Sequence, residues 1–190
     1  MLKKNKKLYI VLFIAKKLVT LVILFFFSNC NKPVPAQKPV QTPKNGQREL
    51  SQKTGKLLLE NETNAIQEAI KTKFKNEKFK KTQLAFWISE SIEEKEINKM
   101  GDLITYTYEV YNLNKQLIYS FSEIGTKTLA LEKQNEIRGI EYALKIMKEE
   151  EEAYLLLPSF LAYAGYGDKN KIKPNTPIAI KLKIIKINKQ

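Results

Sequence analysis

The sequence predicts an α+β domain, in which an antiparallel sheet wraps around one short helix and is preceded by an N-terminal helix. Two stretches, residues 104–110 and 176–187, alternate apolar with polar side chains, a period of two that is typical of half-buried strands. Between them, residues 135–148 place apolar side chains three and four residues apart, which indicates an amphipathic helix. Strands on both sides of a single helix favour an antiparallel sheet packed on that helix.

The first elements lie before the alternating strand. Residues 49–80 are predicted to be a helical segment, because the apolar side chains between 57 and 76 follow mostly one helical stripe. Residues 81–92 are rich in aromatic and β-branched side chains, so we predict that they form a strand that opens a domain over 81–190. Gly101 and Asp102 then indicate a turn.

The remaining elements follow the alternating strand. Short strands are predicted at 116–120, 127–131 and 153–157, the first of them after a turn at 112–115. A loop over 158–173 precedes the last strand. It is longer than most loops in compact domains, and loops of that length are usually functional or mobile.

Composition excludes several kinds of chemistry. The 190 residues include no histidine and a single cysteine, Cys30. This rules out Ser-His-Asp and Cys-His nucleophile systems, zinc sites built from Cys and His, and an internal disulfide. Apolar residues make up 43% and charged residues 28%, as is ordinary for a folded domain. We predict no metal and no cofactor.

The N-terminal residues are predicted to be an export signal. Residues 1–29 have a lysine-rich start and then the mostly apolar stretch 18–27, which as a helix rises about 15 Å and is too short for a bilayer core of about 30 Å. The segment ending in Cys30 resembles the lipobox of bacterial lipoproteins, which implies a cleaved signal peptide and a lipidated cysteine. An uncleaved anchor is the alternative. Both interpretations tether the domain to a lipid bilayer outside the cytoplasm.

A tether follows the cysteine, over residues 30–48. Four of the seven prolines lie within residues 33–43, which favours an extended polyproline-II-like spacer. In lipoproteins of gliding bacteria, acidic residues just after the cysteine direct surface export. Here Asn31, Lys32 and Pro33 follow the cysteine, and none of them is acidic. By resemblance to those lipoproteins, we therefore predict a membrane-anchored lipoprotein that is not exported to the surface and faces the periplasm.

The net charge of +13 does not by itself indicate nucleic-acid binding. Residues 1–29 contain six lysines and no acid, so their removal lowers the net charge to +7. Seven more lysines lie in residues 169–190, again without an acid. No aromatic side chain is interleaved with the lysines of the last strand to stack on bases. We therefore predict a basic face that favours solubility and no nucleic-acid partner.

Residues 101–187 resemble the FKBP-type peptidyl-prolyl cis-trans isomerases. Four motifs in the family's order carry the resemblance: Gly101-Asp102 before a strand that ends in Tyr108, Glu136-Ile137-Arg138-Gly139 at a helix start, Leu155-Leu156-Leu157-Pro158 running into Leu161-Ala162-Tyr163, and Ile172-Lys173-Pro174-Asn175-Thr176 before the terminal strand. With the signal, lipidated cysteine, tether and N-terminal helix, the whole arrangement is similar to the gliding-motility-associated FKBP-type lipoproteins.

The resemblance implies a half-barrel sheet around the helix and an apolar pocket that binds Xaa-Pro segments of exported proteins. In that pocket Tyr108 would line the wall, the backbone N–H of Ile137 would bind a substrate carbonyl, and Tyr163 would hydrogen-bond another. The other residues that would line it are Ile118, Tyr119, the floor residue Ile140, Ile172 and Ile180.

The implied reaction suits a chain without histidine. Rotation about a peptidyl-prolyl bond makes and breaks no covalent bond, yet its barrier is about 18–20 kcal/mol because amide resonance is lost. An apolar pocket lowers this barrier if it binds the twisted amide better than the planar one. On pattern alone, however, Tyr108 and Ile140 are core residues of a strand and a helix.

Two functions therefore remain open. The first is a membrane-anchored isomerase that assists folding or assembly of exported proteins, such as those of a gliding machine. The alternative is a catalytically weak FKBP-like module that binds proteins as a chaperone. The retained Tyr108, Ile137 and Tyr163 favour the first. Two departures from the family favour the second: Ile140 replaces a Trp and Tyr119 an Asp. Val110 and Ala164, each in place of a Gly, are further departures.

Overall fold

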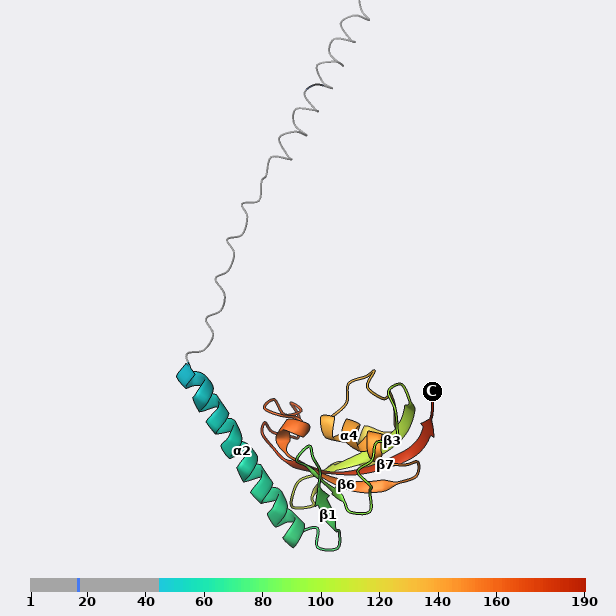
Figure 1. Ribbon diagram of the computed structural model, residues 1–190, viewed down its shortest axis with the longest axis horizontal. Helices are drawn as coiled ribbons and strands as arrows, with labels where there is room; N and C mark the ends of the chain where they lie inside the picture. The colour runs from blue at the N-terminus through green and yellow to red at the C-terminus, as the bar shows by residue number, and fades with distance from the viewer. Residues whose placement is uncertain (1–16, 18–44) are drawn as a thin grey trace, which may run out of the picture. The chain divides into compact units, whose positions relative to one another are not determined.

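A computed structural model describes Lys17 and residues 45–190 of the chain (Figure 1). The predicted lipidated Cys30, the tether up to residue 44 and, apart from Lys17, the predicted signal peptide lie outside these described residues. Residues 45–190 form one compact unit. Among the described residues, no helix is both long enough and apolar enough to cross a bilayer.

The described elements follow one another in an order close to the predicted one. They are α2 (Asn45–Thr72), β1 (Phe79–Lys81), β2 (Trp87–Ser89), β3 (Leu103–Tyr111), β4 (Leu117–Tyr119), α3 (Phe121–Ile124), β5 (Lys127–Ala130), α4 (Arg138–Ile146), β6 (Glu152–Leu157), the 3-10 turn η1 (Ser159–Leu161) and β7 (Ile178–Asn188). We call residues 158–177, between β6 and β7, the flap loop.

The seven strands form one antiparallel sheet of order β1-β2-β6-β7-β3-β4, with β5 also paired to β3. Helix α4 lies over one face of this sheet (Figure 1), and its buried residues Ile140, Ala143 and Leu144 belong to the same core cluster as the inner face of the sheet. This arrangement confirms the predicted α+β class, with a sheet wrapped around one short helix and preceded by an N-terminal helix.

Strand β3 contributes one face to the core cluster that also contains α4. Its burial alternates without exception, and Ile104, Tyr106, Tyr108 and Val110 are the buried side chains, as the sequence predicted. One edge of β3 pairs with β7 along its whole length. The other edge pairs with β5 at the start of β3 and with β4 at its end. The segment between β4 and β5, which includes α3, therefore connects two partners of the same edge.

The prediction of one strand over residues 81–92 is wrong. The segment contains the turn of a hairpin, in which Lys81 of β1 pairs with Trp87 of β2. The turn is closed by a hydrogen bond from the Thr82 N–H to the Phe86 carbonyl at 2.7 Å, and Ala85 adopts a positive φ of 63°. Since alanine is not a typical turn residue at such a φ, the local sequence gives no turn signal.

Helix α2 is longer at its start than the predicted stripe of residues 57–76, and it ends earlier, at Thr72. Residues 48–57 of the helix are exposed, so the apolar stripe marks the part of the helix that packs. That part forms a second core cluster, in which Ile66 and Ala69 of α2 and the following Phe74 lie with Trp87 and Leu156 of the sheet. The helix begins at Asn45, inside the segment predicted to be tether.

Helix α3 was not predicted, because four residues are too few for a periodic pattern. A capping box defines it. The Ser120 side chain accepts a hydrogen bond from the Glu123 N–H, and the Glu123 carboxylate accepts one from the Ser120 N–H at 2.9 Å. Gly125 ends the helix with a positive φ of 73°.

Candidate functional site

The eight residues predicted to form the site lie in one apolar cluster of the fold. Four of them are buried, with exposed fractions of 4% or less: Tyr108, Ile140, Ile172 and Ile180. Four half-buried residues pack against them: Ile118, Tyr119, Ile137 and Tyr163. The structure thus brings together residues from three strands, the start of a helix and the flap loop, whereas their contacts with a substrate stay predictions.

Tyr108 lies on β3, beside a second tyrosine of the same strand. The rings of Tyr106 and Tyr108 are stacked, with centroids 6.2 Å apart. The Tyr108 hydroxyl accepts a hydrogen bond from Lys127 Nζ at 3.1 Å, and the same ammonium lies 5.1 Å from the Tyr108 ring centroid. Burial raises the pKa of Tyr108, and the Lys127 hydrogen bond offsets part of that rise. Tyr108 is therefore neutral, and the hydrogen bond from Lys127 orients its side chain at the wall of the candidate site.

The backbone N–H of Ile137 is already bound within the protein. Ile137 precedes the first turn of α4, where helix N–H groups lack intrahelical partners. Its N–H donates a hydrogen bond to Glu136 Oε1 at 2.9 Å. Glu136 Oε2 accepts hydrogen bonds from the Tyr106 hydroxyl and, at 3.0 Å, from Lys127 Nζ. The Ile137 N–H, which the resemblance assigns to a substrate carbonyl, thus already donates a hydrogen bond to the Glu136 carboxylate.

Glu136 stays ionised in this setting. Burial by itself would raise its pKa, but the hydrogen bonds from Tyr106, the Ile137 N–H and Lys127 together outweigh burial and lower the pKa below its usual value. The Glu136 side chain is only 11% exposed and that of Lys127 is 39% exposed. A partly buried ion pair therefore joins β5 to the start of α4.

The flap loop begins with a set of backbone hydrogen bonds around Tyr163. The Ser159 carbonyl accepts from the N–H groups of Ala162 at 2.9 Å and Ala164 at 2.7 Å, and the Tyr163 carbonyl accepts from the Gly167 N–H at 3.1 Å. The Tyr163 hydroxyl has no hydrogen-bond partner among the described residues. Burial is the main cause that raises the pKa of Tyr163, so its hydroxyl keeps its proton and can donate it.

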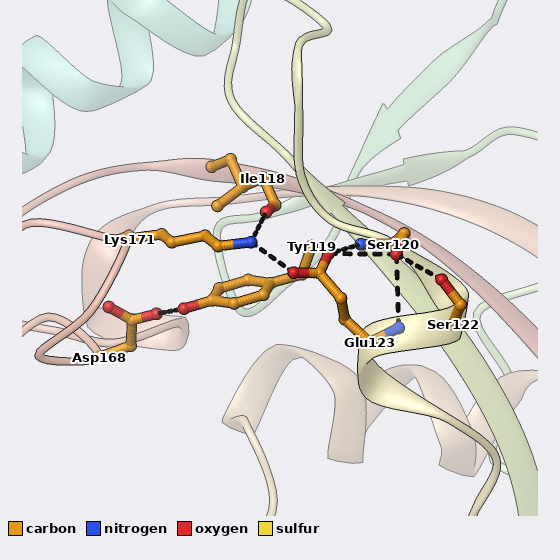
Figure 2. Close-up of polar contacts among 7 residues, drawn as sticks. All are labelled: Ile118, Tyr119, Ser120, Ser122, Glu123, Asp168 and Lys171. Carbon is orange, nitrogen blue, oxygen red and sulfur yellow. Dashed lines mark hydrogen bonds and ion pairs between the residues drawn. The ribbon is translucent and has the colours of Figure 1, made fainter.

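Asp168 organises the far part of the flap loop. Its Oδ1 accepts hydrogen bonds from the N–H groups of Asn170 at 2.9 Å and Ile172 at 2.8 Å, while its Oδ2 accepts one from the Tyr119 hydroxyl (Figure 2). Burial alone would raise the pKa of Asp168, but these hydrogen bonds lower it. The hydrogen bond to Asp168 is the main cause of a raised pKa at Tyr119. This neutral tyrosine and ionised aspartate link β4 to the flap loop.

Lys171 makes a second link between the same two segments. Figure 2 shows its side chain along the Tyr119 ring, and its Nζ lies 4.5 Å from the ring centroid. The ammonium donates hydrogen bonds to the Ile118 carbonyl at 3.0 Å and to Glu123 Oε1 at 2.5 Å. The Lys171 hydrogen bond is the main cause that lowers the pKa of Glu123 to about 2. Both links hold the flap loop against the β4–α3 segment beside the cluster.

Comparison of the sequence with known protein families identifies the family of the part of the chain that contains the candidate site. Residues 94–185, which include all eight site residues, match the FKBP-type peptidyl-prolyl cis-trans isomerase family. Residues 94–185 are an FKBP-type domain. The predicted enzyme class, an FKBP-type peptidyl-prolyl cis-trans isomerase, is thereby confirmed. The finer likeness to gliding-motility lipoproteins stays a prediction. No curated protein matches the sequence.

Solved structures show the same fold at low sequence identity. A peptidyl-prolyl cis-trans isomerase from Pseudomonas syringae pv. tomato has a TM-score of 0.53 at 17% identity, over 70% of this chain and 96% of that one. FkpA from Escherichia coli has a TM-score of 0.52 at 17% identity, over 92% and 82%. The N-terminal domain of FKBP42 from Arabidopsis thaliana has a TM-score of 0.50 at 16% identity, over 59% and 93%.

Sequence reasoning missed four charged residues of the FKBP-type domain: Lys127, Glu136, Asp168 and Lys171. Tyr119 and Asp168 are 49 residues apart in the chain, so no local pattern pairs them. One signal was available. A tyrosine where the family commonly has an aspartate requires an acceptor for its hydroxyl if it is partly buried, and Asp168 is the first acid in the flap loop.

Proposed function

We propose that this protein is a membrane-anchored FKBP-type peptidyl-prolyl isomerase that accelerates cis-trans exchange at Xaa-Pro bonds of exported proteins. One observation carries the proposal: residues from β3, β4, α4, the flap loop and β7 that the family uses for substrate lie in one apolar cluster. Beside them, the Tyr163 hydroxyl is protonated and without a partner among the described residues.

The arrangement suits rotation of an amide. Hydrogen bonds from water stabilise the charge-separated planar amide, so an apolar surface that removes them favours the twisted form. In this proposal the Tyr163 hydroxyl donates a hydrogen bond that orients the peptide on one side of the proline, and Tyr108 contacts the proline ring. Only binding that is stronger in the twisted state accelerates the rotation.

The alternative function, a weakly catalytic binding module, is favoured by a different observation. Ile140, which stands where many active relatives have a Trp, has no exposed surface, and the Ile137 N–H is bound to Glu136. Both features reduce what the site offers to a planar or a twisted amide. The partly buried side chains of Ile118, Tyr119 and Tyr163, which pack against the apolar cluster, would still be available for peptide binding.

Exchange NMR on a proline-containing peptide separates the two functions. We expect the detergent-solubilised full chain to accelerate cis-trans exchange, and Tyr163→Ala to lower the acceleration at least tenfold, because a substrate hydrogen bond is lost. Tyr166→Ala is the matched control, since Tyr166 is 82% exposed and lies in the same loop. Exchange that is equal with and without the protein, together with peptide-induced shifts, would establish the binding module instead.

The proposed location is the periplasmic side of a membrane, with clients such as the exported proteins of a gliding or secretion machine. The supporting features are the lysine-rich start, the short apolar stretch and the single cysteine, Cys30. We expect radiolabelled palmitate to be incorporated into the full chain and to be lost in Cys30→Ser. A Thr42→Ser variant in the tether should keep the label. Equal labelling of Cys30→Ser and the original chain would contradict lipidation at this residue.

A further inference from the structure

The Glu136 carboxylate accepts a hydrogen bond from the one backbone donor that the family resemblance assigns to the substrate, the Ile137 N–H. The Ile137 N–H points to Glu136 Oε1, and the donor and acceptor atoms are 2.9 Å apart. A substrate carbonyl needs the same hydrogen atom. A single N–H shared between two acceptors binds each more weakly than it binds one, so the carbonyl and the carboxylate compete.

Glu136 is held in this arrangement by groups from two strands. Its other oxygen accepts from the Tyr106 hydroxyl of β3 and, at 3.0 Å, from Lys127 Nζ of β5. Tyr106 is 1% exposed and the Glu136 side chain 11% exposed, so this carboxylate is not a freely rotating surface group. Lys127 also binds the Tyr108 hydroxyl, which places the whole polar group next to the cluster.

We propose that Glu136 is a specificity-determining residue that competes with the substrate carbonyl for the Ile137 N–H and so limits the affinity of this site for Xaa-Pro peptides. The inference rests on the proposed function and on the family resemblance, which assigns that N–H to a substrate carbonyl. Binding then includes a rotation of the Glu136 carboxylate away from the N–H, while its bonds to Tyr106 and Lys127 can remain. Peptides whose other contacts are too few to displace the carboxylate are rejected.

The test compares two variants without the Tyr106 hydroxyl, so that removal of Glu136 does not leave this buried hydroxyl without its acceptor. Tyr106→Phe serves as the reference background, and Tyr106→Phe with Glu136→Ala removes the competitor from it. We expect the dissociation constant for a proline-containing peptide, measured by NMR titration of the full chain, to fall about tenfold in the double variant. This is the size expected for a hydrogen bond to a charged group. The exchange rate at saturating peptide should change less than twofold.

Lys127→Met in the Tyr106→Phe background is the matched control, because it removes the remaining partner of Glu136 Oε2 and leaves the carboxylate beside the Ile137 N–H. It also removes the hydrogen bond to the Tyr108 hydroxyl. Its peptide affinity should not increase. A structural role of the ion pair would instead change Lys127→Met and the double variant in the same direction. Equal or weaker peptide binding by a folded double variant would overturn the proposal.

A measurement on the unmodified chain covers the case in which the double variant does not fold. Peptide binding should shift both the carboxyl carbon resonance of Glu136 and the amide proton resonance of Ile137, as the carboxylate leaves and a carbonyl replaces it. Peptide that binds without moving the Glu136 resonance overturns this inference alone. A chain that neither binds peptide nor accelerates exchange overturns the proposed function itself, and the inference with it.

Discussion

Replacing Gly167 with alanine is expected to lower kcat/KM for a Xaa-Pro peptide at least tenfold while the domain remains folded. A Cβ on Gly167 would lie 2.3 Å from the Ile172 carbonyl oxygen and 2.9 Å from the Lys173 carbonyl carbon, so the backbone of the loop must move. Gly167 also has a φ of +64°, which costs a residue with a side chain about 1–2 kcal/mol. The movement displaces Ile172 and the hydrogen bond from the Gly167 N–H to the Tyr163 carbonyl.

Gly165 offers a control in the same loop. A Cβ there would meet nothing closer than Asn175 Oδ1, at 3.6 Å, which is an ordinary contact. Gly165→Ala should therefore keep kcat/KM within about twofold. Steady-state kinetics of both variants, with circular dichroism to verify folding, make the comparison. If Gly167→Ala were as active as Gly165→Ala, the conformation of the flap loop would not matter for catalysis.

The parts of the fold that could be predicted are those whose own sequence repeats the pattern of their burial. Strand β3 alternates Ile104, Tyr106, Tyr108 and Val110 with polar residues because one of its faces lies in the core. Helix α4 has apolar residues on one face for the same reason. The hairpin turn at Ala85 and the short helix α3 could not be predicted, because a positive φ at an alanine and a four-residue helix leave no periodic signal.

The candidate site, too, has a part that the sequence predicts and a part that it does not. Its apolar residues were found by resemblance, because the family motifs fix their places in the order of the elements. The contacts that decide which donors are available were not found, since they join distant segments through charged side chains. The hydrogen bond of Glu136 to the Ile137 N–H is local in sequence, but the bonds of Tyr106 and Lys127 to the other carboxylate oxygen join it to two strands that no local pattern connects with it.

A similar long-range contact ties the N-terminal helix to the FKBP-type domain. Glu62 of α2 is 5% exposed, and Ser159 at the start of the flap loop is 3% exposed. Glu62 Oε2 accepts a hydrogen bond from the Ser159 N–H at 2.8 Å, and Oε1 accepts one from the Ser159 hydroxyl at 2.6 Å. Because the Ser159 carbonyl binds the N–H groups on both sides of Tyr163, α2 supports the loop that carries the candidate site.

Replacing Glu62 with alanine is therefore expected to lower the free energy of unfolding by about 3 kcal/mol. The variant leaves two buried donors of Ser159 without partners, and hydrogen bonds to charged groups contribute about 1.5–3 kcal/mol each. Urea unfolding with an unchanged m-value measures the loss. Glu68→Ala, an exposed residue on the same helix, should stay within about 0.5 kcal/mol of the original chain. The Glu62→Ala variant should also lose isomerase activity at urea concentrations below its unfolding midpoint, where it is still folded. The reason is that Ser159, whose carbonyl binds the N–H groups on both sides of Tyr163, has lost its hydrogen bonds to Glu62. A loss of stability with full activity would mean that α2 stabilises the domain without positioning the flap loop.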